Sequence, residues 1–393
     1  MKPLFSPPLY MQRHQFVVDF VKKHQPKKVV DLGCADCRLL RKLKYHRDTE
    51  VLVGVDINSA VIRQKMYALA PFPSEYLQPG DKPLTIELYQ GSVIEKEPRT
   101  KGSDLVTCIE LIEHLPFAEV ERFSEVLFGY MAPAAVIVST PNADFNPLLP
   151  GCSGFRHIDH KFEWTRAEFQ NWALDVCRLY GYVVEFTGVG KAPCNENVGF
   201  CSQMGVFHKD ISRSNSFLGT ENKDDTTSYR LLYSVVYPSL CDNNIFQRML
   251  VNEVLYGAEH IKKKWLETSK EKEEGPHECQ VSKYPGDHQE QSLAGGEEPY
   301  LQGGAICVPL ARVLPFPKVH ALCGSLRRLQ EALLGESRVK LTNDAEALML
   351  PISEEDEEEI DVDEESEEYR GPACTETMQF MADCVQEDWD AEL

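Results

Sequence analysis

The sequence lacks any apolar run long enough to cross a bilayer, since a membrane-spanning helix needs about 20 predominantly apolar residues. It also lacks a signal peptide, and its 13 cysteines include no two CxxC pairs at the spacing of a zinc ribbon. Most cysteines are therefore expected to be buried, reduced thiols. These absences argue against a secreted disulfide scaffold and predict a cytoplasmic protein without membrane association.

The sequence has no overall excess of positive charge, and its net charge is −21. Residues 1–210 hold 24 Lys+Arg against 25 Asp+Glu, whereas the remainder holds 17 against 37. The first part is thus nearly neutral and does not repel an anionic substrate. The acidity is concentrated in the second part, where residues 354–368 contain twelve acids and no base and are expected to be solvated and extended.

Short apolar segments alternate with helical patterns through the first half of the chain. Each strand is nearly all apolar, which is typical of a parallel sheet covered on both faces. Two final segments follow each other without a helix and predict an antiparallel edge. We therefore expect an α/β fold with a seven-stranded, mostly parallel sheet, its strands near residues 28–32, 51–55, 84–89, 104–109, 134–139, 182–186 and 199–207.

The alternation ends near residue 210, so we expect the main domain to cover residues 1–210. Residues 211–265 hold one strand-like and one helical stretch and are predicted to be a C-terminal extension. Residues 266–304 are rich in Glu, Lys, Gly and Gln and predict a disordered linker. Residues 305–350 regain apolar content and predict a small packed element, and residues 351–393 an acidic disordered tail.

A nucleoside pocket is predicted where the first two strands end. Asp31, Gly33 and Ala35 form a glycine turn between a strand and a helix, and Asp56 closes the next strand, where a carboxylate can accept ribose hydroxyls. Arg38 stands where a dinucleotide motif has its third glycine, which favours S-adenosylmethionine over a dinucleotide. In this interpretation Asp31 faces the amino group and Ser92 the adenine edge. The alternative is that Gly33 is only a turn residue and Asp56 a helix N-cap.

A metal site is predicted after the strand at 104–109. Glu110, Glu113 and His114 are spaced i, i+3, i+4, so on a helical turn they share one face. Two acids and an imidazole in one place indicate a bound cation, although a solvated helix start is the alternative. The loop at 155–166 offers His157 or His160 as a fourth ligand. The letters His157-x-Asp159 also match a non-haem iron triad, which the alternating sheet disfavours.

The pair of motifs Glu-x-x-Glu-His and Asp-His-Lys-Phe-Glu-Trp-Thr-Arg resembles the Hua-enhancer family of small-RNA 3′-terminal 2′-O-methyltransferases. The resemblance covers roughly residues 8–210, and the length and tail are similar to the animal branch that acts on piRNAs. It implies a Rossmann-like class I methyltransferase with S-adenosylmethionine bound around Gly33, Asp56 and Ser92. It implies Mg²⁺ dependence and the ligands Glu110, Glu113, His114 and His160, with His157 left out. A PIWI-type Argonaute presenting the RNA, a location in germ granules and a monomeric state would follow from it.

A cation bound to both hydroxyls of a terminal ribose would activate the 2′-oxygen and explain a requirement for an RNA 3′ end. Two imidazole ligands suit Mn²⁺ or Co²⁺ at least as well as Mg²⁺. The nearby Arg156, Lys161 and Arg166 are candidates for phosphate contacts, and Trp164 or Phe162 for base stacking. Two other hypotheses stay open: a metal-dependent methyltransferase acting on a small vicinal diol, and a non-enzymatic scaffold that binds partners through its acidic tail.

Overall fold

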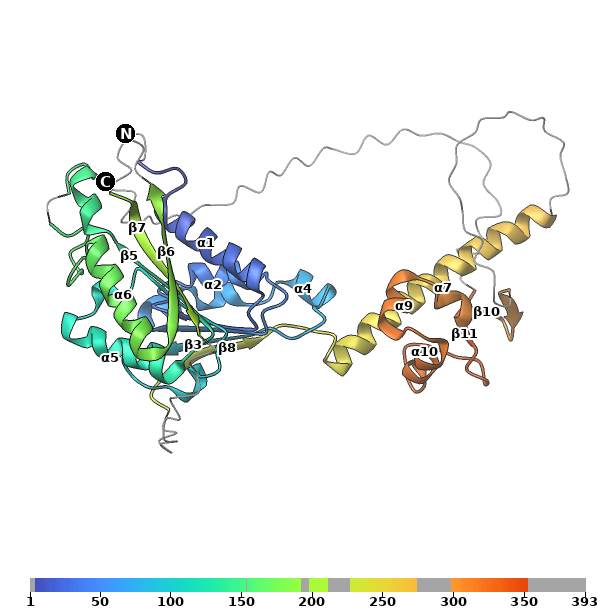
Figure 1. The fold of residues 1–393 in the computed structure, drawn as a ribbon. Helices are drawn as coiled ribbons and strands as arrows, with labels where there is room; N and C mark the ends of the chain where they lie inside the picture. The colour runs from blue at the N-terminus through green and yellow to red at the C-terminus, as the bar shows by residue number, and fades with distance from the viewer. Residues whose placement is uncertain (1–3, 153, 192–197, 211–226, 274–297, 353–393) are drawn as a thin grey trace, which may run out of the picture. The chain divides into compact units, whose positions relative to one another are not determined.

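The computed structural model describes residues 4–152, 154–191, 198–210, 227–273 and 298–352. These residues form two units, the first ending at Leu240 and the second beginning at Cys241 (Figure 1). Within these ranges, no helix is long and apolar enough to cross a membrane.

The first unit is built on an eight-stranded sheet with the order β6-β7-β5-β4-β1-β2-β3-β8. Its five central strands are parallel: β1 (Lys28–Leu32), β2 (Val51–Asp56), β3 (Thr85–Gln90), β4 (Leu105–Ile109) and β5 (Ala135–Pro141). The antiparallel strands lie at both edges: β6 (Tyr182–Lys191) and β7 (Phe200–Lys209) beside β5, and β8 (Arg230–Val236) beside β3. The mostly parallel sheet is confirmed.

Helices cover both faces of this sheet because consecutive strand residues point to opposite sides. Val29 belongs to the core formed with α1 (Leu9–His24) and α2 (Arg38–Leu43), and Val30 to the core formed with α5 (Val120–Ser124) and α6 (Arg166–Tyr180). Helix α5 continues into a π-helical segment, Glu125–Met131, and the short helices α3 (Ser59–Lys65) and α4 (Pro73–Leu77) precede β3. Helix α6 starts at a capping box between Thr165 and Glu168 and ends at Gly181, which has a φ of 73°.

The predicted strand count of seven is wrong by one, and the boundary at residue 210 is wrong for the same reason. Strand β8 comes from the stretch that the sequence placed in a C-terminal extension, but it hydrogen-bonds to β3 along Thr85–Gln90. None of its residues is fully buried, so its strand-like pattern did not identify it as part of the main sheet. Tyr229, just before β8, is buried and donates its hydroxyl to the Ser92 carbonyl oxygen at 3.0 Å.

The second unit packs α7 (Asn243–Glu273) on a three-stranded antiparallel sheet with the order β11-β10-β9. The remaining elements are β9 (Tyr300–Gln302), β10 (Ala305–Pro309), α8 (Leu310–Val313), α9 (Pro317–Cys323), α10 (Leu326–Leu333) and β11 (Ala347–Pro351). The packed element predicted at 305–350 therefore shares one core with the helix predicted to belong to the preceding extension. Helix α7 and strand β9 also extend into the predicted linker, of which residues 274–297 lie outside the described residues, as does the tail from 353.

Candidate functional site: a glycine loop beside a histidine cluster

The site lies at the carboxyl ends of β1, β2 and β4, where the strand order changes direction between β1 and β4. Open α/β sheets bind ligands at this switch point because the loops after neighbouring strands diverge to opposite faces. The loop after β1 contains Gly33, the loop after β2 contains Asn58, and the loop after β4 contains Glu113 and His114.

The glycine loop after β1 makes a tight turn with positive φ at Gly33 (77°), Ala35 (42°) and Cys37 (62°). A Cβ on Gly33 would lie 2.9 Å from Leu111 Cδ1, so the loop after β4 packs directly against this turn. Asp56 closes the turn from β2, since its Oδ2 accepts the Ala35 N–H at 2.9 Å. The N-cap of α3 is Asn58 and not Asp56, so the alternative interpretation of Asp56 as a helix N-cap is wrong.

Asp31, the last acid before the glycine, is almost fully buried at 3% exposure. Its Oδ1 accepts the Thr107 hydroxyl at 2.7 Å, but burial dominates and raises the pKa of the Asp31 carboxyl to about 7. Ser92 lies after β3, and its backbone carbonyl accepts a hydrogen bond from the Tyr229 hydroxyl. The Ser92 hydroxyl forms no hydrogen bond within the described part of the chain. The roles predicted for Asp31, Gly33, Asp56 and Ser92 toward a cofactor stay predictions.

Glu110 follows β4 in a left-handed conformation with a φ of 49°, which turns the chain sharply out of the sheet. Its Oε1 accepts hydrogen bonds from the hydroxyls of Ser139 and Ser202, both at 2.8 Å, and its Oε2 lies 3.5 Å from Arg13 Nη1 on α1. Arg13 is buried, so Glu110 connects β4, β5, β7 and α1 at one point.

Glu113 and His114 lie in a single 3₁₀ turn, Ile112–His114, and not in the α-helical turn that their spacing suggested. With three residues per turn, neighbouring side chains diverge by about 120°. The Glu113 carboxylate therefore points into the protein with 0% exposure, while His114 is exposed. Glu113 Oε2 accepts the Thr140 hydroxyl at 3.0 Å, and Oε1 has no hydrogen-bond partner among the described residues.

An unpartnered oxygen on a buried carboxylate is costly, and burial together with the nearby Glu110 raises the pKa of Glu113. Its backbone carbonyl accepts the Lys161 N–H at 2.8 Å, which brings the histidine loop over this turn. The Glu113 side chain thus offers one buried oxygen that a cation would satisfy.

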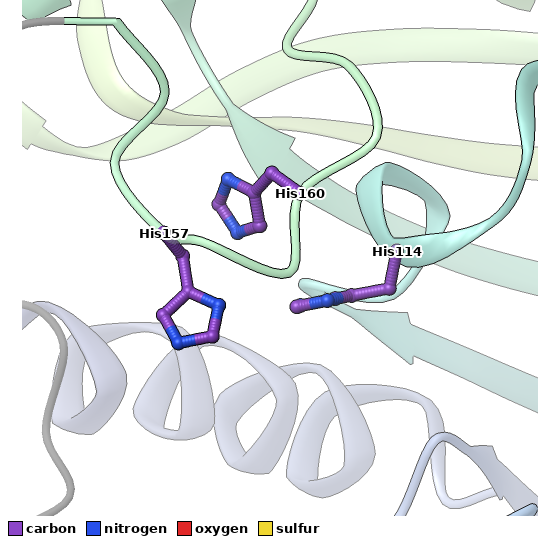
Figure 2. Close-up of side chains that lie close together, drawn as sticks. All are labelled: His114, His157 and His160. Atoms are coloured by element: carbon purple, nitrogen blue, oxygen red, sulfur yellow. The ribbon is translucent and has the colours of Figure 1, made fainter.

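Three imidazoles meet above this turn, with ligand atoms within 4.8 Å of one another (Figure 2). They belong to His114 on the 3₁₀ turn and to His157 and His160 in the loop before α6. The rings of His114 and His160 have centroids 4.9 Å apart and lie nearly perpendicular at 80°. Desolvation by the surrounding loops, followed by the charges of His160 and His157, lowers the pKa of His114 to about 4, so its imidazole is neutral at pH 7.

Glu163 orients His160, although no role was predicted for it from the motif in which it lies. Its Oε1 accepts a hydrogen bond from His160 Nδ1 at 2.5 Å, which leaves His160 Nε2 as the atom with a free lone pair. Burial would raise the pKa of Glu163, but hydrogen bonds from His160 and Asn146 outweigh this effect and lower it. Carboxylate–histidine pairs of this kind are characteristic of metal sites, so the residues present fit a divalent cation.

His157 belongs to this cluster, although the family resemblance left it out of the ligand set, and its hydrogen bonding differs from that of His160. Its Nδ1 accepts the Asp159 N–H at 3.1 Å, so the neutral ring carries its proton on Nε2. This arrangement favours His157 as a hydrogen-bond donor beside the site. Among the described residues, the structure thus groups the ligand atoms of His114, His157 and His160, and the carboxylates of Glu110 and Glu113 are not part of this group. The four-ligand assignment stays a prediction.

Two expectations for the histidine loop are wrong. Arg156 does not face a phosphate, because its guanidinium donates to the Asn146 side chain and to the backbone carbonyls of Asn142 and Cys201. Trp164 is only 6% exposed and belongs to the core, so it offers no stacking surface. An exposed aromatic near this loop is Phe117, which is 66% exposed and packs edge-on against Phe162, with ring centroids 5.5 Å apart.

The fold and the glycine loop define a class I, S-adenosylmethionine-dependent methyltransferase, and a profile described as a methyltransferase domain matches residues 9–184. A second profile, described as the HENMT1 C-terminal domain, matches residues 244–352. The chain is 45% identical over 363 residues to the small RNA 2′-O-methyltransferase of Gallus gallus, covering 90% of this chain and 96% of that protein. It therefore belongs to the small RNA 2′-O-methyltransferase family.

More distant relatives agree with this membership. The small RNA 2′-O-methyltransferase of Drosophila melanogaster is 35% identical over 292 residues, covering 70% of this chain and 74% of that protein. The crystal structure of the small RNA methyltransferase HEN1 superposes with a TM-score of 0.52 at 30% identity, covering 61% of this chain and 29% of that one.

Proposed function

We propose that this chain transfers a methyl group from S-adenosylmethionine to the 2′-hydroxyl of the 3′-terminal nucleotide of single-stranded small RNA. Its relatives are named small RNA 2′-O-methyltransferases. The observation that carries the proposal is the buried Oε1 of Glu113, which has no hydrogen-bond partner among the described residues and lies in a turn against the glycine loop and below the histidine loop.

S-adenosylmethionine supplies the methyl group from its sulfonium, and Asp31, Gly33, Asp56 and Ser92 would hold it. Asp56 is already fixed by the Ala35 and Asn58 N–H groups, so it keeps the glycine turn in shape. The buried Asp31 carboxylate, whose ionisation is disfavoured by burial, would gain most from a positively charged amino group.

Glu110, Glu113, His114 and His160 would hold a divalent cation, which when bound lowers the pKa of a ribose hydroxyl and fixes its position. Glu163 keeps His160 in the required tautomer, and the low pKa of His114 keeps that ring neutral. Mg²⁺ is the cation implied by the family resemblance, whereas two imidazole ligands favour Mn²⁺ or Co²⁺.

The exposed edge of the site has the composition that a terminal nucleotide requires. Phe117 offers an open aromatic ring three residues after His114, and Lys161 on the histidine loop and Arg166 at the start of α6 are exposed. We further propose a piRNA-like substrate presented by a PIWI-type protein in the cytoplasm or its germ granules, on the family resemblance alone.

The test is periodate oxidation of RNA after incubation with the full chain, S-adenosylmethionine and metal. RNA with a free 3′ end should become resistant, whereas RNA with a 3′-phosphate or a 3′-deoxy end should not accept the methyl group, as followed by a labelled methyl. Glu113→Ala and His160→Ala should abolish transfer but keep cofactor affinity, measured by calorimetry. Equal methylation of blocked ends, or of a small diol in preference to RNA, would overturn the proposal.

A metal panel at equal concentrations checks the ligand set. Mn²⁺ or Co²⁺ should support at least as much transfer as Mg²⁺, because the site supplies imidazole nitrogen as well as carboxylate oxygen. A clear preference for Mg²⁺ would instead indicate that oxygen ligands alone hold the cation.

A further inference from the structure

Helices α1 and α2 bring five basic side chains together, and one of them, Arg13, contacts Glu110. Arg38, Arg41 and Lys42 come from α2, and Arg13 and His14 from α1; we call them the α1–α2 cluster. Electrostatic contact joins them, since Lys42, Arg13, Arg38 and Arg41 all act on His14.

The positive charge of this cluster is only partly neutralised. Arg38 pairs with Asp36 at 2.7 Å and lies over the Tyr10 ring at 5.5 Å. In the described part of the chain, however, neither Arg41 nor Lys42 forms an ion pair. Arg41 Nε and His14 Nδ1 are, moreover, buried atoms without a hydrogen-bond partner in these residues.

The positive charges of the α1–α2 cluster repel one another, and contacts within the described residues only partly compensate this repulsion. Burial, and then the charges of Lys42 and the arginines, lowers the pKa of His14 to about 3, so His14 is neutral and adds no further repulsion. Burial and the charges of Arg38 and Arg41 also lower the pKa of Lys42. Partly buried, mutually repelling cations gain most from a bound anion.

We propose that the α1–α2 cluster binds phosphate groups of the RNA backbone upstream of the 3′-terminal nucleotide. The proposal rests on the proposed function, because the ion pair between Arg13 and Glu110 joins the cluster to the site where the RNA would end. Arg41 and Lys42, on the neighbouring α2, are the two cations of the cluster without an acidic partner in the described residues, so they would be available to upstream phosphates. Phosphate contacts of this kind position an RNA without reading its sequence.

Two other kinds of anion could bind a basic cluster, and the choice of substituted residues and of ligands distinguishes them from RNA. The carboxylate of S-adenosylmethionine would be met by Arg38, which opens α2 directly after the glycine loop. An acidic peptide would use the same charges as RNA but would not require a free 3′ end. The test therefore uses Arg41 and Lys42, one turn further along α2.

The experiment compares the full chain with the double variant Arg41→Gln/Lys42→Gln. Binding of a labelled single-stranded RNA is measured at several salt concentrations, together with KM and kcat for terminal methylation and calorimetric affinity for S-adenosylmethionine. The slope of log affinity against log salt should fall by about 1.4, roughly 0.7 for each lost contact. KM for RNA should rise about tenfold, while kcat and cofactor affinity stay unchanged.

Lys22→Gln/Lys23→Gln is the matched control, because it removes two exposed charges from the last turn of α1. It should leave the salt slope unchanged. If the double variant unfolds, Lys42→Gln alone is the second variant. Its salt slope should fall by about half as much as that expected for the double variant.

An unchanged slope, a loss confined to cofactor affinity, or weaker binding of oligoglutamate with RNA binding intact would overturn the assignment. If the unmodified chain binds RNA but produces no periodate-resistant ends, the proposed function fails. In that case the change in salt slope still shows whether Arg41 and Lys42 contact the RNA backbone.

Discussion

At the scale of single residues, the site is made of groups whose ionisation is shifted by burial. Asp31 is a carboxyl with a pKa raised to about 7, and Glu113 a carboxyl with a raised pKa and an oxygen without a partner in the described residues. Both side chains cost stability when charged and alone. Each lies at the carboxyl end of a central strand, where a bound cation or ammonium group would remove this cost.

Asp31 gives cofactor affinity a specific pH dependence. Its folded pKa lies above the model-peptide value of about 4, so the ionised form that binds a positive amino group is populated only as the pH rises through 7. The dissociation constant for S-adenosylmethionine should therefore rise about tenfold for each pH unit below 7, which means weaker binding. Calorimetry from pH 5.5 to 8.5 measures this. Asp31→Asn should bind weakly with a flat profile, and a pH-independent wild-type constant would refute the contact.

Glu163 is a positioning residue whose effect should appear in metal binding. Glu163→Gln replaces the charged acceptor of His160 Nδ1 with a neutral one, so Mn²⁺ affinity should fall by a factor of about 10–100. Titration with Mn²⁺ followed by electron paramagnetic resonance measures this directly, without relying on activity. Asp159→Asn removes the same charge from an exposed position in the same loop, and it should change the affinity much less.

At the scale of elements, the parallel strands could be predicted because each is a short, nearly all-apolar run. The acids and histidines that follow these strands could be predicted from the two motifs. The supporting contacts could not. Arg13 and Leu111 contact Glu110 and Gly33, which are far away from them in the chain, and Glu163 contacts His160 through a loop conformation that no periodicity predicts. The helical spacing of Glu113 and His114 was misleading because a three-residue 3₁₀ turn replaces the expected helix. Trp164 and Arg156 were misread for a similar reason, since burial and backbone partners decide their roles.

The glycine loop and the loop after β4 should behave as one coupled element. Gly33→Ala adds a Cβ 2.9 Å from Leu111 Cδ1 at a φ of 77°, a left-handed conformation that costs about 1–2 kcal/mol for other residues. It should lower both the free energy of unfolding and cofactor affinity. Adding Leu111→Ala removes the clash but not the backbone strain, so a double-mutant cycle of urea unfolding should show partial rescue. Purely additive losses would mean that the two loops do not touch in solution.

At the scale of the whole molecule, β8 decides where the methyltransferase unit ends. Arg99, which forms a 2.7 Å ion pair with Glu97, also donates to the Tyr229 carbonyl oxygen at 2.7 Å, and the N–H groups of Ser228 and Tyr229 donate to Glu97. The buried Tyr237 donates its hydroxyl to the Leu69 carbonyl oxygen at 2.6 Å. A chain ending at residue 210 would therefore leave β3 as an uncovered edge and Glu97 with fewer donors.

Two truncations test this boundary. A chain of residues 1–240 should keep a cooperative thermal transition and its affinity for S-adenosylmethionine, because all eight strands are present. A chain of residues 1–210 should lose the Tyr229 ring that packs on Gly91, beside Ser92, and should expose the edge of β3 to aggregation. We expect it to be less stable and to bind the cofactor more weakly, measured by calorimetry and light scattering. Equal stability of the two chains would show that β8 is an addition to a sheet already complete with seven strands.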